Sequence, residues 1–227
     1  MTDFAADSIL VVLETTPDGT LAKSAAGLLG AASTVGTPVA LLVSDDAGLA
    51  TEAGALGAAT VLTAPAASDQ LTVPIVDALA SAYALVKPDA VLVSNSIEGR
   101  DDARAGRFAA RQSLALAVDA VGVARDDEGV LAEHSVYGGA YNVTAAPTFG
   151  APVITVRQGA IEARADAVAA PAVVALDVTA SGAPAAKVES FAAAEVTSSR
   201  PELRGASKVV SGGRGLGSKE KFALVEQ

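Results

Sequence analysis

The sequence predicts an α/β fold in which a Rossmann-like parallel sheet carries helices on both faces and has an antiparallel extension. Three observations support this prediction. Uninterrupted apolar runs such as Ser8–Leu13 alternate with alanine-rich segments of helical period, as in central parallel strands covered by helices. Aromatic residues make up only 4% of the 227 residues, as expected for layers packed from Ala, Val and Leu. After residue 126 the pattern changes to short strands around glycines.

The first 125 residues predict strands and helices in strict alternation. Ser8–Leu13 is followed by a turn at Pro17-Asp18-Gly19, and Thr20 is expected to cap a helix that ends at Val35. The later strands are expected at Val39–Val43, Ala59–Thr63, Asp89–Ser94 and near Val118–Arg125, and the helices between them at Ala47–Leu56, Leu71–Val86 and about Arg100–Ala115. This alternation implies right-handed crossovers and one parallel sheet.

The next segment predicts a hairpin. Val130–Val136 and Tyr141–Ala145 flank the bend Tyr137-Gly138-Gly139-Ala140, and Ala151–Arg157 is expected to form another strand. From Gly159 to about Arg200 the chain is rich in Ala and Pro, with one strand-like run at 172–178. We interpret this stretch as a covering strand followed by an interdomain connector.

Charge and composition exclude several classes of function. The net charge is −10, with 11 Lys/Arg against 23 Asp/Glu in residues 1–200, so nucleic acid is not an expected partner. Residues 201–227 are slightly basic, with 5 against 3. Cys is absent and His134 is the only His, which leaves few ligands for zinc and none for an iron–sulfur cluster. No membrane span or targeting segment is predicted, so we expect a soluble, cytoplasmic protein.

A glycine-rich motif lies near the end of the chain. A β-branched run from Lys208 ends at Ser211, and four glycines follow within six positions: Gly212, Gly213, Gly215 and Gly217. Ser218 then opens a stretch of helical character. Strand, glycine loop and helix start together favour binding of an anion such as a phosphate or pyrophosphate. Since the chain ends soon after, the motif is expected to open a domain that the chain holds only in part.

Four arginines lie along one face of a predicted helix. Arg100, Arg104, Arg107 and Arg111 are spaced four, three and four residues apart. They predict either a solvated face with weak ion pairs or a docking surface for a partner.

Other polar clusters predict little chemistry. Asp45-Asp46 and Asp126-Asp127-Glu128 are expected to be solvated turns, and His134 to be a structural or surface residue. Asn95-Ser96 and Gly99 follow a buried strand, where α/β sheets bind ligands, but no phosphate loop follows the first strand at Glu14.

Several of these segments resemble one family. The strand Pro152–Arg157, the hairpin Tyr137–Val143, and above all Arg200-Pro-Glu-Leu203 leading into Val209–Leu216 resemble the α subunit of electron transfer flavoprotein. The resemblance covers the whole chain, loosely from Ser8 to Val156 and tightly from Arg200 to Phe222. It divides the chain into a Rossmann-like N-terminal domain at 1–158, a covering strand and connector at 159–204, and the incomplete start of an FAD-binding domain at 205–227.

The resemblance implies an electron carrier rather than an enzyme. Such an α subunit pairs with a β subunit as a heterodimer, and its FAD passes electrons from dehydrogenases to a quinone reductase, with a link to fatty acid oxidation. AMP is expected in the β subunit. The residues expected to contact FAD are Arg214 first, and then Ser211, Gly212, Gly213, Gly215 and Leu216.

The chain also departs from the family. The family's Gly-Gln-Thr-Gly-Lys and Gly-Ile-Ser-Gly-Ala-Ile-Gln-His stretches, which also contact FAD, do not occur in this sequence. We therefore expect that this chain alone does not hold FAD. Two other hypotheses stay open: a cofactor-free interaction module for a β-like partner, and a nucleotide-binding Rossmann-like enzyme that uses the sheet edge near Asn95.

Overall fold

The computed structural model describes residues 3–66, 69–97, 99, 104–190, 192 and 208–226. The chain forms two compact units, Met1–Phe191 and Ala192–Gln227, and each is described by itself.

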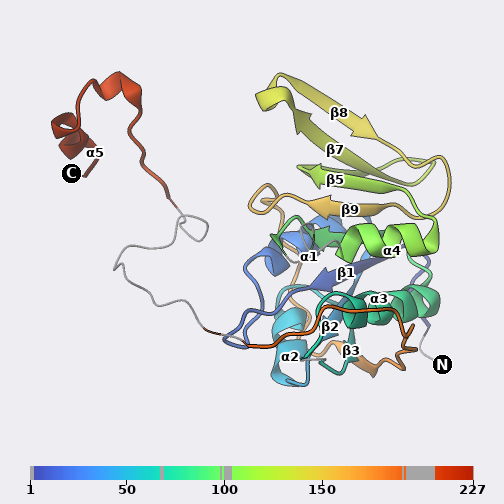
Figure 1. Cartoon of the computed structure of the whole chain (residues 1–227). Coiled ribbons are helices and arrows are strands. Elements are labelled where there is room, and N and C mark those ends of the chain that lie inside the picture. Colours follow the sequence, from blue (N-terminus) through green and yellow to red (C-terminus); the bar gives the residue numbers. More distant parts are fainter. Residues whose placement is uncertain are drawn as a thin grey trace. The chain divides into compact units, whose positions relative to one another are not determined.

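The first unit contains two sheets (Figure 1). The larger sheet has seven strands in the order β10-β3-β2-β1-β4-β9-β5, and every pairing in it is parallel. Its strands are β1 (Ser8–Leu13), β2 (Thr37–Val43), β3 (Thr60–Ala64), β4 (Ala90–Ser94), β5 (Leu116–Ala120), β9 (Val153–Val156) and β10 (Ala172–Ala175). The smaller sheet is antiparallel, with β6 (Gly122–Arg125), β7 (Val130–Val136) and β8 (Tyr141–Ala145) in that order. The predicted fold class is confirmed.

Helices cover both faces of the parallel sheet. On one face α1 (Ser24–Val35) and α2 (Gly48–Ala55) pack on Ile9, Val11 and Leu13, and on the other α3 (Val73–Val86) and α4 (Arg104–Gln112) pack on Leu10 and Val12. Successive side chains of β1 point to opposite faces, so an uninterrupted apolar run is what a strand buried on both sides requires. All six residues of β1 are buried.

In the first unit, the structure corrects two of the predicted elements. The first helix begins at Ser24 rather than after a cap at Thr20, because the chain first folds back on itself and Leu21 bridges to Thr15. The single strand expected near Val118–Arg125 is two strands in different sheets, β5 and β6, separated at Val121.

The antiparallel sheet rests on α1 at one end. Val130 and Ala132, at the start of β7, are buried in the same apolar core as α1. The same strand face continues to His134 and Val136, opposite Val143 and Tyr141 of β8, and Tyr141 and Val143 there are exposed. The hairpin therefore projects beyond the core, as β7 and β8 do in Figure 1.

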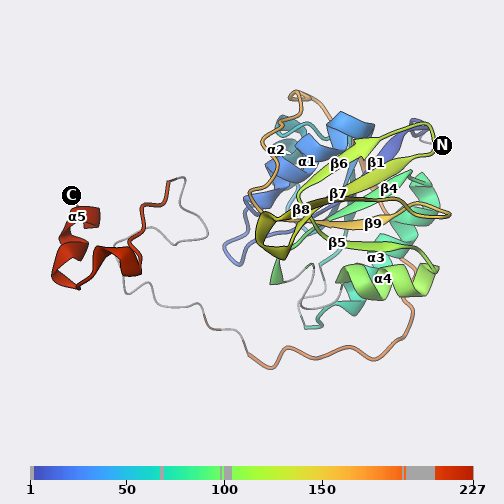
Figure 2. The same cartoon turned by 90° about the horizontal axis from the view of Figure 1, so that it is seen from above.

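Residues 159–171 run across the outer surface of α1 and α2 and pack closely on both helices (Figure 2). They connect β9 to β10, which is the edge strand at the other end of the sheet. A Cβ built on Gly30 of α1 would lie 2.0 Å from the carbonyl oxygen of Ala163. One on Gly54 of α2 would lie 2.7 Å from Pro171. Glycine is thus required at both positions by the close approach of this segment.

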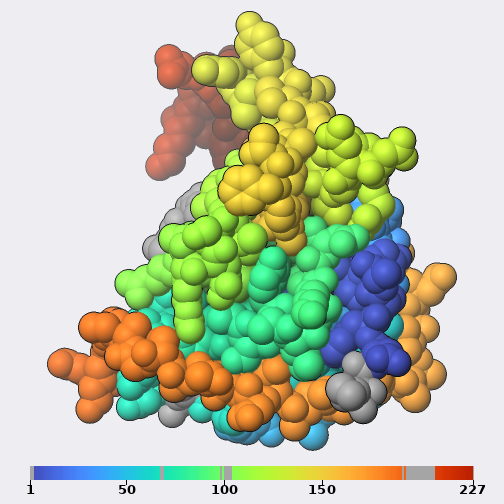
Figure 3. Space-filling model, turned by 90° about the vertical axis from the view of Figure 1, so that its right-hand side faces the viewer, coloured from blue at the N-terminus to red at the C-terminus, as the bar shows by residue number. Residues whose placement is uncertain are grey.

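After β10 the chain returns along α3. The amide of Leu71 donates to Ala186 O and that of Val188 to Asp69 O, both at 2.9 Å. In Figure 3 residues 176–190, which we call the strap, form the orange band below the helices. The predicted domain boundaries at 158 and 204 stay predictions.

Candidate functional site

A buried polar pair links the segment after β1 to the segment after β4. Ser96, just after β4, donates a 2.6 Å hydrogen bond to Glu14 Oε1, and its hydroxyl accepts a 2.8 Å hydrogen bond from the amide of Gly99. Glu14 and Ser96 are each only 7% exposed. In Rossmann-like folds a ligand binds beyond the strand ends at this position, and here a carboxylate and a hydroxyl of the chain hydrogen-bond each other there.

A second polar cluster lies at the carboxyl ends of β4, β9 and β5. Asn95 Nδ2 donates to Asp119 Oδ1 at 2.6 Å, and the Thr155 hydroxyl lies 3.2 Å from Asn95 Oδ1. Arg157 donates to both carboxylate oxygens of Asp119, at 3.1 and 2.7 Å. The hydrogen bonds that Arg157 donates to Asp119 raise the pKa of Arg157 above its usual value. The cluster's polar groups thus hydrogen-bond one another.

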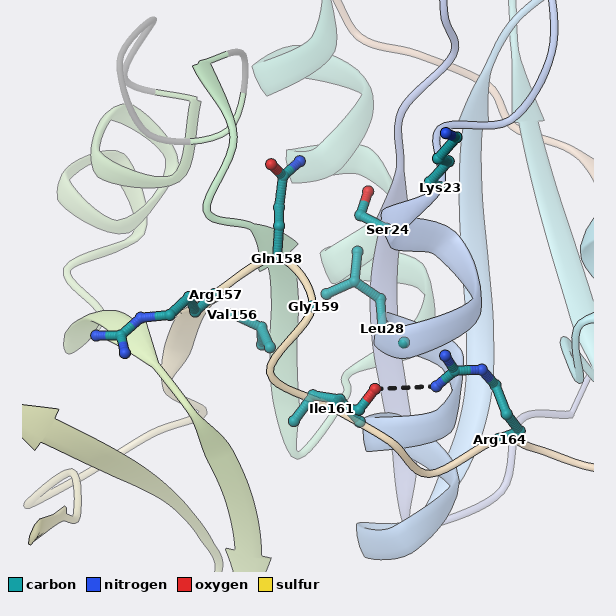
Figure 4. Close-up of a pocket in the computed structure, with 10 residues that line it drawn as sticks. Lys23, Ser24, Leu28, Val156, Arg157, Gln158, Gly159, Ile161 and Arg164 are labelled. Atoms are coloured by element: carbon teal, nitrogen blue, oxygen red, sulfur yellow. Dashed lines mark hydrogen bonds between the residues drawn. The ribbon is translucent and has the colours of Figure 1, made fainter. Parts of the chain in front are cut away.

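A cavity between α1 and the end of β9 is small. It has a volume of about 50 Å³ and is lined by Lys23, Ser24, Gln158 and Arg164, among others (Figure 4). Arg164 donates to Ile161 O at 2.9 Å, and the guanidinium of Arg157 is directed away from the cavity. Ligand pockets usually measure about 300–1,000 Å³, so this cavity has room for water or a small ion and not for a nucleotide. This cavity therefore gives no support to a nucleotide site at the edge near Asn95, while two larger cavities, of about 470 and 510 Å³, lie beside the end of β3.

The glycine motif lies in the second unit. The amides of Leu216 and Gly217 donate to Gly213 O and Arg214 O, which forms a short 3-10 turn, η4 (Arg214–Leu216). Gly217 has φ 80°, a left-handed conformation that suits glycine. A Cβ on Gly212 would lie 2.4 Å from Leu216 and 2.9 Å from Phe222, so these side chains close over the backbone there. Ser211, Gly213, Arg214 and Gly215 are exposed.

The predicted strand before the loop is wrong for its described residues. Val209 and Val210 form no strand and are 56% and 76% exposed. No described strand pairs with them, and a run this short is not stable alone. The helix start is present as a 3-10 turn, η5 (Glu220–Phe222), followed by α5 (Ala223–Glu226).

The arginine face of α4 is only partly available. Arg111 pairs with buried Asp77 of α3, and Arg104 is half-buried, whereas Arg107 is exposed. Arg100 lies outside the described residues. The docking role of these arginines stays a prediction.

The acidic clusters act as turn caps. Asp46 Oδ1 accepts the amide of Gly48 at 2.7 Å, and Asp126 Oδ1 accepts those of Glu128 and Gly129. His134 lies in β7 opposite Val143. Across the described part of the chain, no three His, Cys, Asp or Glu residues are grouped as a metal ion would require.

The sequence did not predict the hydrogen-bond partners of Asn95 and Glu14, or the cluster around Asp119. One feature of the sequence indicated this cluster: Thr155 is a polar residue inside the apolar run of β9, and in the structure it is 1% exposed. A buried hydroxyl needs a hydrogen-bond partner. Its distant partners, however, are brought close only by the order of strands in the sheet.

These observations define a class of protein: a doubly wound α/β unit in which Ser96 and Glu14 hydrogen-bond each other at the strand ends where related folds bind a nucleotide. Comparison with known proteins then identifies the family. Residues 9–195 match the family model of the electron transfer flavoprotein domain. The chain is 40% identical over 222 residues to the electron transfer flavoprotein subunit alpha of Mycobacterium leprae, which covers 96% of this chain and 67% of that relative.

Two further relatives agree. The protein of the same name from Mycobacterium tuberculosis is 39% identical over 223 residues, and that from Paracoccus denitrificans is 61% identical over a stretch of 41 residues, or 18% of this chain and 13% of that relative. This chain belongs to the electron transfer flavoprotein family, and it is an α-subunit-like electron transfer protein rather than an enzyme. Among the described residues, no helix combines the length and apolar character needed to cross a membrane.

Proposed function

We propose that this chain works as the α subunit of a heterodimer with a β subunit. The assembled protein would take electrons from dehydrogenases and pass them, through FAD, to a quinone reductase, and AMP would belong to the β subunit. The observation that supports this most is the buried hydrogen bond between Ser96 and Glu14 at the strand ends where related folds bind a ligand. A Rossmann-like unit that uses its polar groups at this position for hydrogen bonds of its own is suited to act as a scaffold for partners.

We place the β subunit on the projecting hairpin. Val136, Tyr141 and Val143 continue the buried face of β7 beyond the core, and the ring of Tyr137 in the turn packs on Tyr141; we call these four residues the hairpin surface. Tyr137 and Tyr141 are 84% and 63% exposed, and their rings meet edge to face at 5.8 Å. Exposed tyrosines are typical anchors of interfaces, because they bury a large area and lose little conformational entropy. The relatives' name, subunit alpha, supports an assembled protein as the occupant.

FAD in the assembled protein would be contacted by the glycine motif, with Arg214 as the cation and Ser211, Gly212, Gly213, Gly215 and Leu216 as loop backbone. A cationic Arg214 near the flavin would stabilise its reduced, anionic form. We propose that residues 208–226 alone do not retain FAD, since a flavin needs a pocket that buries most of its surface. The second unit's described residues expose nearly all of this loop.

The test is to express this chain with its cognate β subunit and to measure both the mass of the complex and its visible absorbance. We expect a one-to-one complex without stoichiometric flavin. A complex without flavin would also be expected if the chain were a cofactor-free interaction module. A second protein, in which this chain is extended with the remaining third of an α-subunit relative, distinguishes the two hypotheses. The extended chain binds flavin in the proposed function and does not bind it if the chain is a cofactor-free module. A chain that stays alone beside the β subunit would contradict the proposal.

Two variants separate the docking surfaces. Tyr141→Ala removes an anchor of the hairpin surface, and Arg107→Glu reverses the exposed charge of α4. We expect Tyr141→Ala to weaken binding of the β subunit by about tenfold or more and Arg107→Glu to weaken it less. A larger loss of affinity in Arg107→Glu than in Tyr141→Ala would indicate that the β subunit binds the arginine face of α4 instead.

A further inference from the structure

The chain passes from one sheet to the other within two residues. β5 ends at Ala120 in the parallel sheet, β6 begins at Gly122 in the antiparallel sheet, and the amide of Val121 between them donates to Glu133 O of β7 at 2.7 Å. Just before this crossing, the pairing of β5 with β9 shifts register and Asp119 adopts φ 65°. Asp and Asn tolerate this left-handed conformation better than other side chains. We call residues 119–121 the junction.

Side chains from β4 and β9, or just after them, fix the junction. Asn95, following β4, and Arg157, following β9, both donate to the carboxylate of Asp119, and the Asp119 amide donates to the hydroxyl of Thr155 at 2.9 Å. Since the bidentate pairing of Arg157 uses two N–H groups in a rigid fork, it sets direction as well as distance.

Arg157 also contacts the antiparallel sheet. Its Nη2 lies 3.4 Å from Ser135 O of β7, and its amide donates to Ala120 O at 2.8 Å. Ser135 pairs with Asn142 of β8, which lies between Tyr141 and Val143 of the hairpin surface. One guanidinium therefore connects the edge of the parallel sheet to the strand pair that carries the exposed aromatic residues.

We infer that Asp119 and Arg157 are positioning residues that hold the hairpin surface in the orientation in which the β subunit binds it. This inference rests on the proposed function. The side chains of Asp119 and Arg157 are 39% and 42% exposed, and an ion pair this exposed contributes little to global stability. The ion pair instead restricts the motion of the projecting hairpin. A surface that is already held in its binding geometry loses less conformational entropy when the partner binds.

A second ion pair provides a matched control. Arg125 and Asp89 are joined at the same 2.7 Å with similar exposure, 32% and 37%. The other hydrogen bond of the Arg125 guanidinium reaches Val35 O at the end of α1, away from the hairpin surface. Asp89→Asn and Asp119→Asn thus each remove one comparable ion pair, but only the second one loosens the junction.

The experiment measures the affinity of the cognate β subunit for the wild-type chain and for Asp119→Asn, Arg157→Lys and Asp89→Asn. Asn keeps the left-handed backbone and removes the charge, and Lys keeps the charge but cannot bridge Asp119 and Ser135 together. We expect both junction variants to bind about three- to tenfold more weakly, with little change in Tm, and Asp89→Asn to bind as the wild type does.

A double-mutant cycle shows whether the effect passes through the hairpin surface. In the Tyr141→Ala background, Asp119→Asn should cost less affinity than it does in the wild type, because the anchor whose position it disturbs is gone. Hydrogen exchange of residues 134–143 in the unbound chain should be faster in both junction variants and unchanged in Asp89→Asn.

The outcomes distinguish the two proposals. A wild-type chain that does not bind the β subunit contradicts the proposed function, while hydrogen exchange still tests the junction. If the wild type binds, equal affinity of all variants overturns the positioning role, as does unchanged exchange of residues 134–143 in the junction variants. Strictly additive effects of Asp119→Asn and Tyr141→Ala overturn it too.

Discussion

The hydroxyl of Ser96 donates to the carboxylate of Glu14 across the ends of the neighbouring strands β4 and β1. Both residues are buried, and Ser96 also satisfies the amide of Gly99. A position that receives a ligand in related folds is here part of the protein's own hydrogen-bond network.

Removing that hydroxyl should destabilise the protein. Ser96→Ala takes a donor from the Glu14 carboxylate and the acceptor from the Gly99 amide, and buried groups left without a partner cost about 1–3 kcal/mol. Urea unfolding would measure the loss. Ser44→Ala is the control, because the hydroxyl of Ser44 accepts a hydrogen bond from Asp46 at an exposed turn and should matter by at most about 0.5 kcal/mol. An equal decrease in the free energy of unfolding in the two variants would show that the buried Ser96–Glu14 pair stabilises the protein no more than the exposed turn does.

Two glycine-to-alanine changes should have opposite effects. In Gly30→Ala the new methyl meets Ala163 O, so residues 159–171 must shift, at a cost of about 1–3 kcal/mol. In Gly106→Ala the methyl meets nothing within 4 Å inside α4, so the gain in helix propensity should stabilise the protein by about 0.5–1 kcal/mol. Thermal unfolding of both variants checks the sign. A stabilised Gly30→Ala would show that residues 159–171 are not tightly packed against α1.

Much of the parallel sheet could be predicted from the sequence, because a strand buried on both faces needs a continuous apolar run. Ser8–Leu13 is predicted to the residue, and the turn at Gly138 and Gly139 places the hairpin correctly. The predicted positions of the elements are wrong where tertiary contacts, rather than the local sequence, determine the structure. Thr20 has the chemistry of a helix cap, yet its hydroxyl lies 2.8 Å from that of Thr16 within the turn before α1.

The candidate site was less predictable. Arg111 was expected on an exposed face, but its partner Asp77 comes from another helix 34 residues earlier. Arg157 and Asp119 are brought together by a sheet order in which β9 lies between β4 and β5, and local patterns contain no information about that order. The glycine motif, by contrast, could be located from sequence because its spacing and its family resemblance are both local.

Replacing Arg214 should weaken flavin binding in a longer protein. The protein to use is a chimera in which this chain is followed by the remaining third of the Mycobacterium leprae relative, produced together with a β subunit. A hydrogen bond to a charged group contributes about 1.5–3 kcal/mol, so Arg214→Ala should lose FAD about tenfold to a hundredfold more readily, and Arg214→Lys should lose less. Flavin absorbance after dialysis measures this. Retention equal to the wild type in Arg214→Ala would remove Arg214 from the flavin site.

Asp77 should make the strap sensitive to acid. Burial raises the pKa of this carboxyl, but the amide and hydroxyl of Ser181 and the guanidinium of Arg111 outweigh it, so the pKa lies below its ordinary value of 3.8. Because the carboxylate is stabilised in the folded state, its contribution is present at neutral pH and is lost as the pH falls through that lowered pKa.

Asp77→Asn should therefore be less stable than the wild type at neutral pH, by about 1–3 kcal/mol, and the difference should shrink in acid. Urea unfolding at several pH values measures both effects. Limited proteolysis should cut the strap of the variant sooner, because the single acceptor oxygen of Asn cannot serve both Arg111 and Ser181, as the two carboxylate oxygens of Asp77 do. Asp177→Asn, at an exposed position on the same strap, is the control and should change neither. If the Asp77→Asn difference stayed constant from neutral pH to acid, the carboxylate would not be the source of the effect, and packing of Asp77 against α4 and the strap would have to explain it.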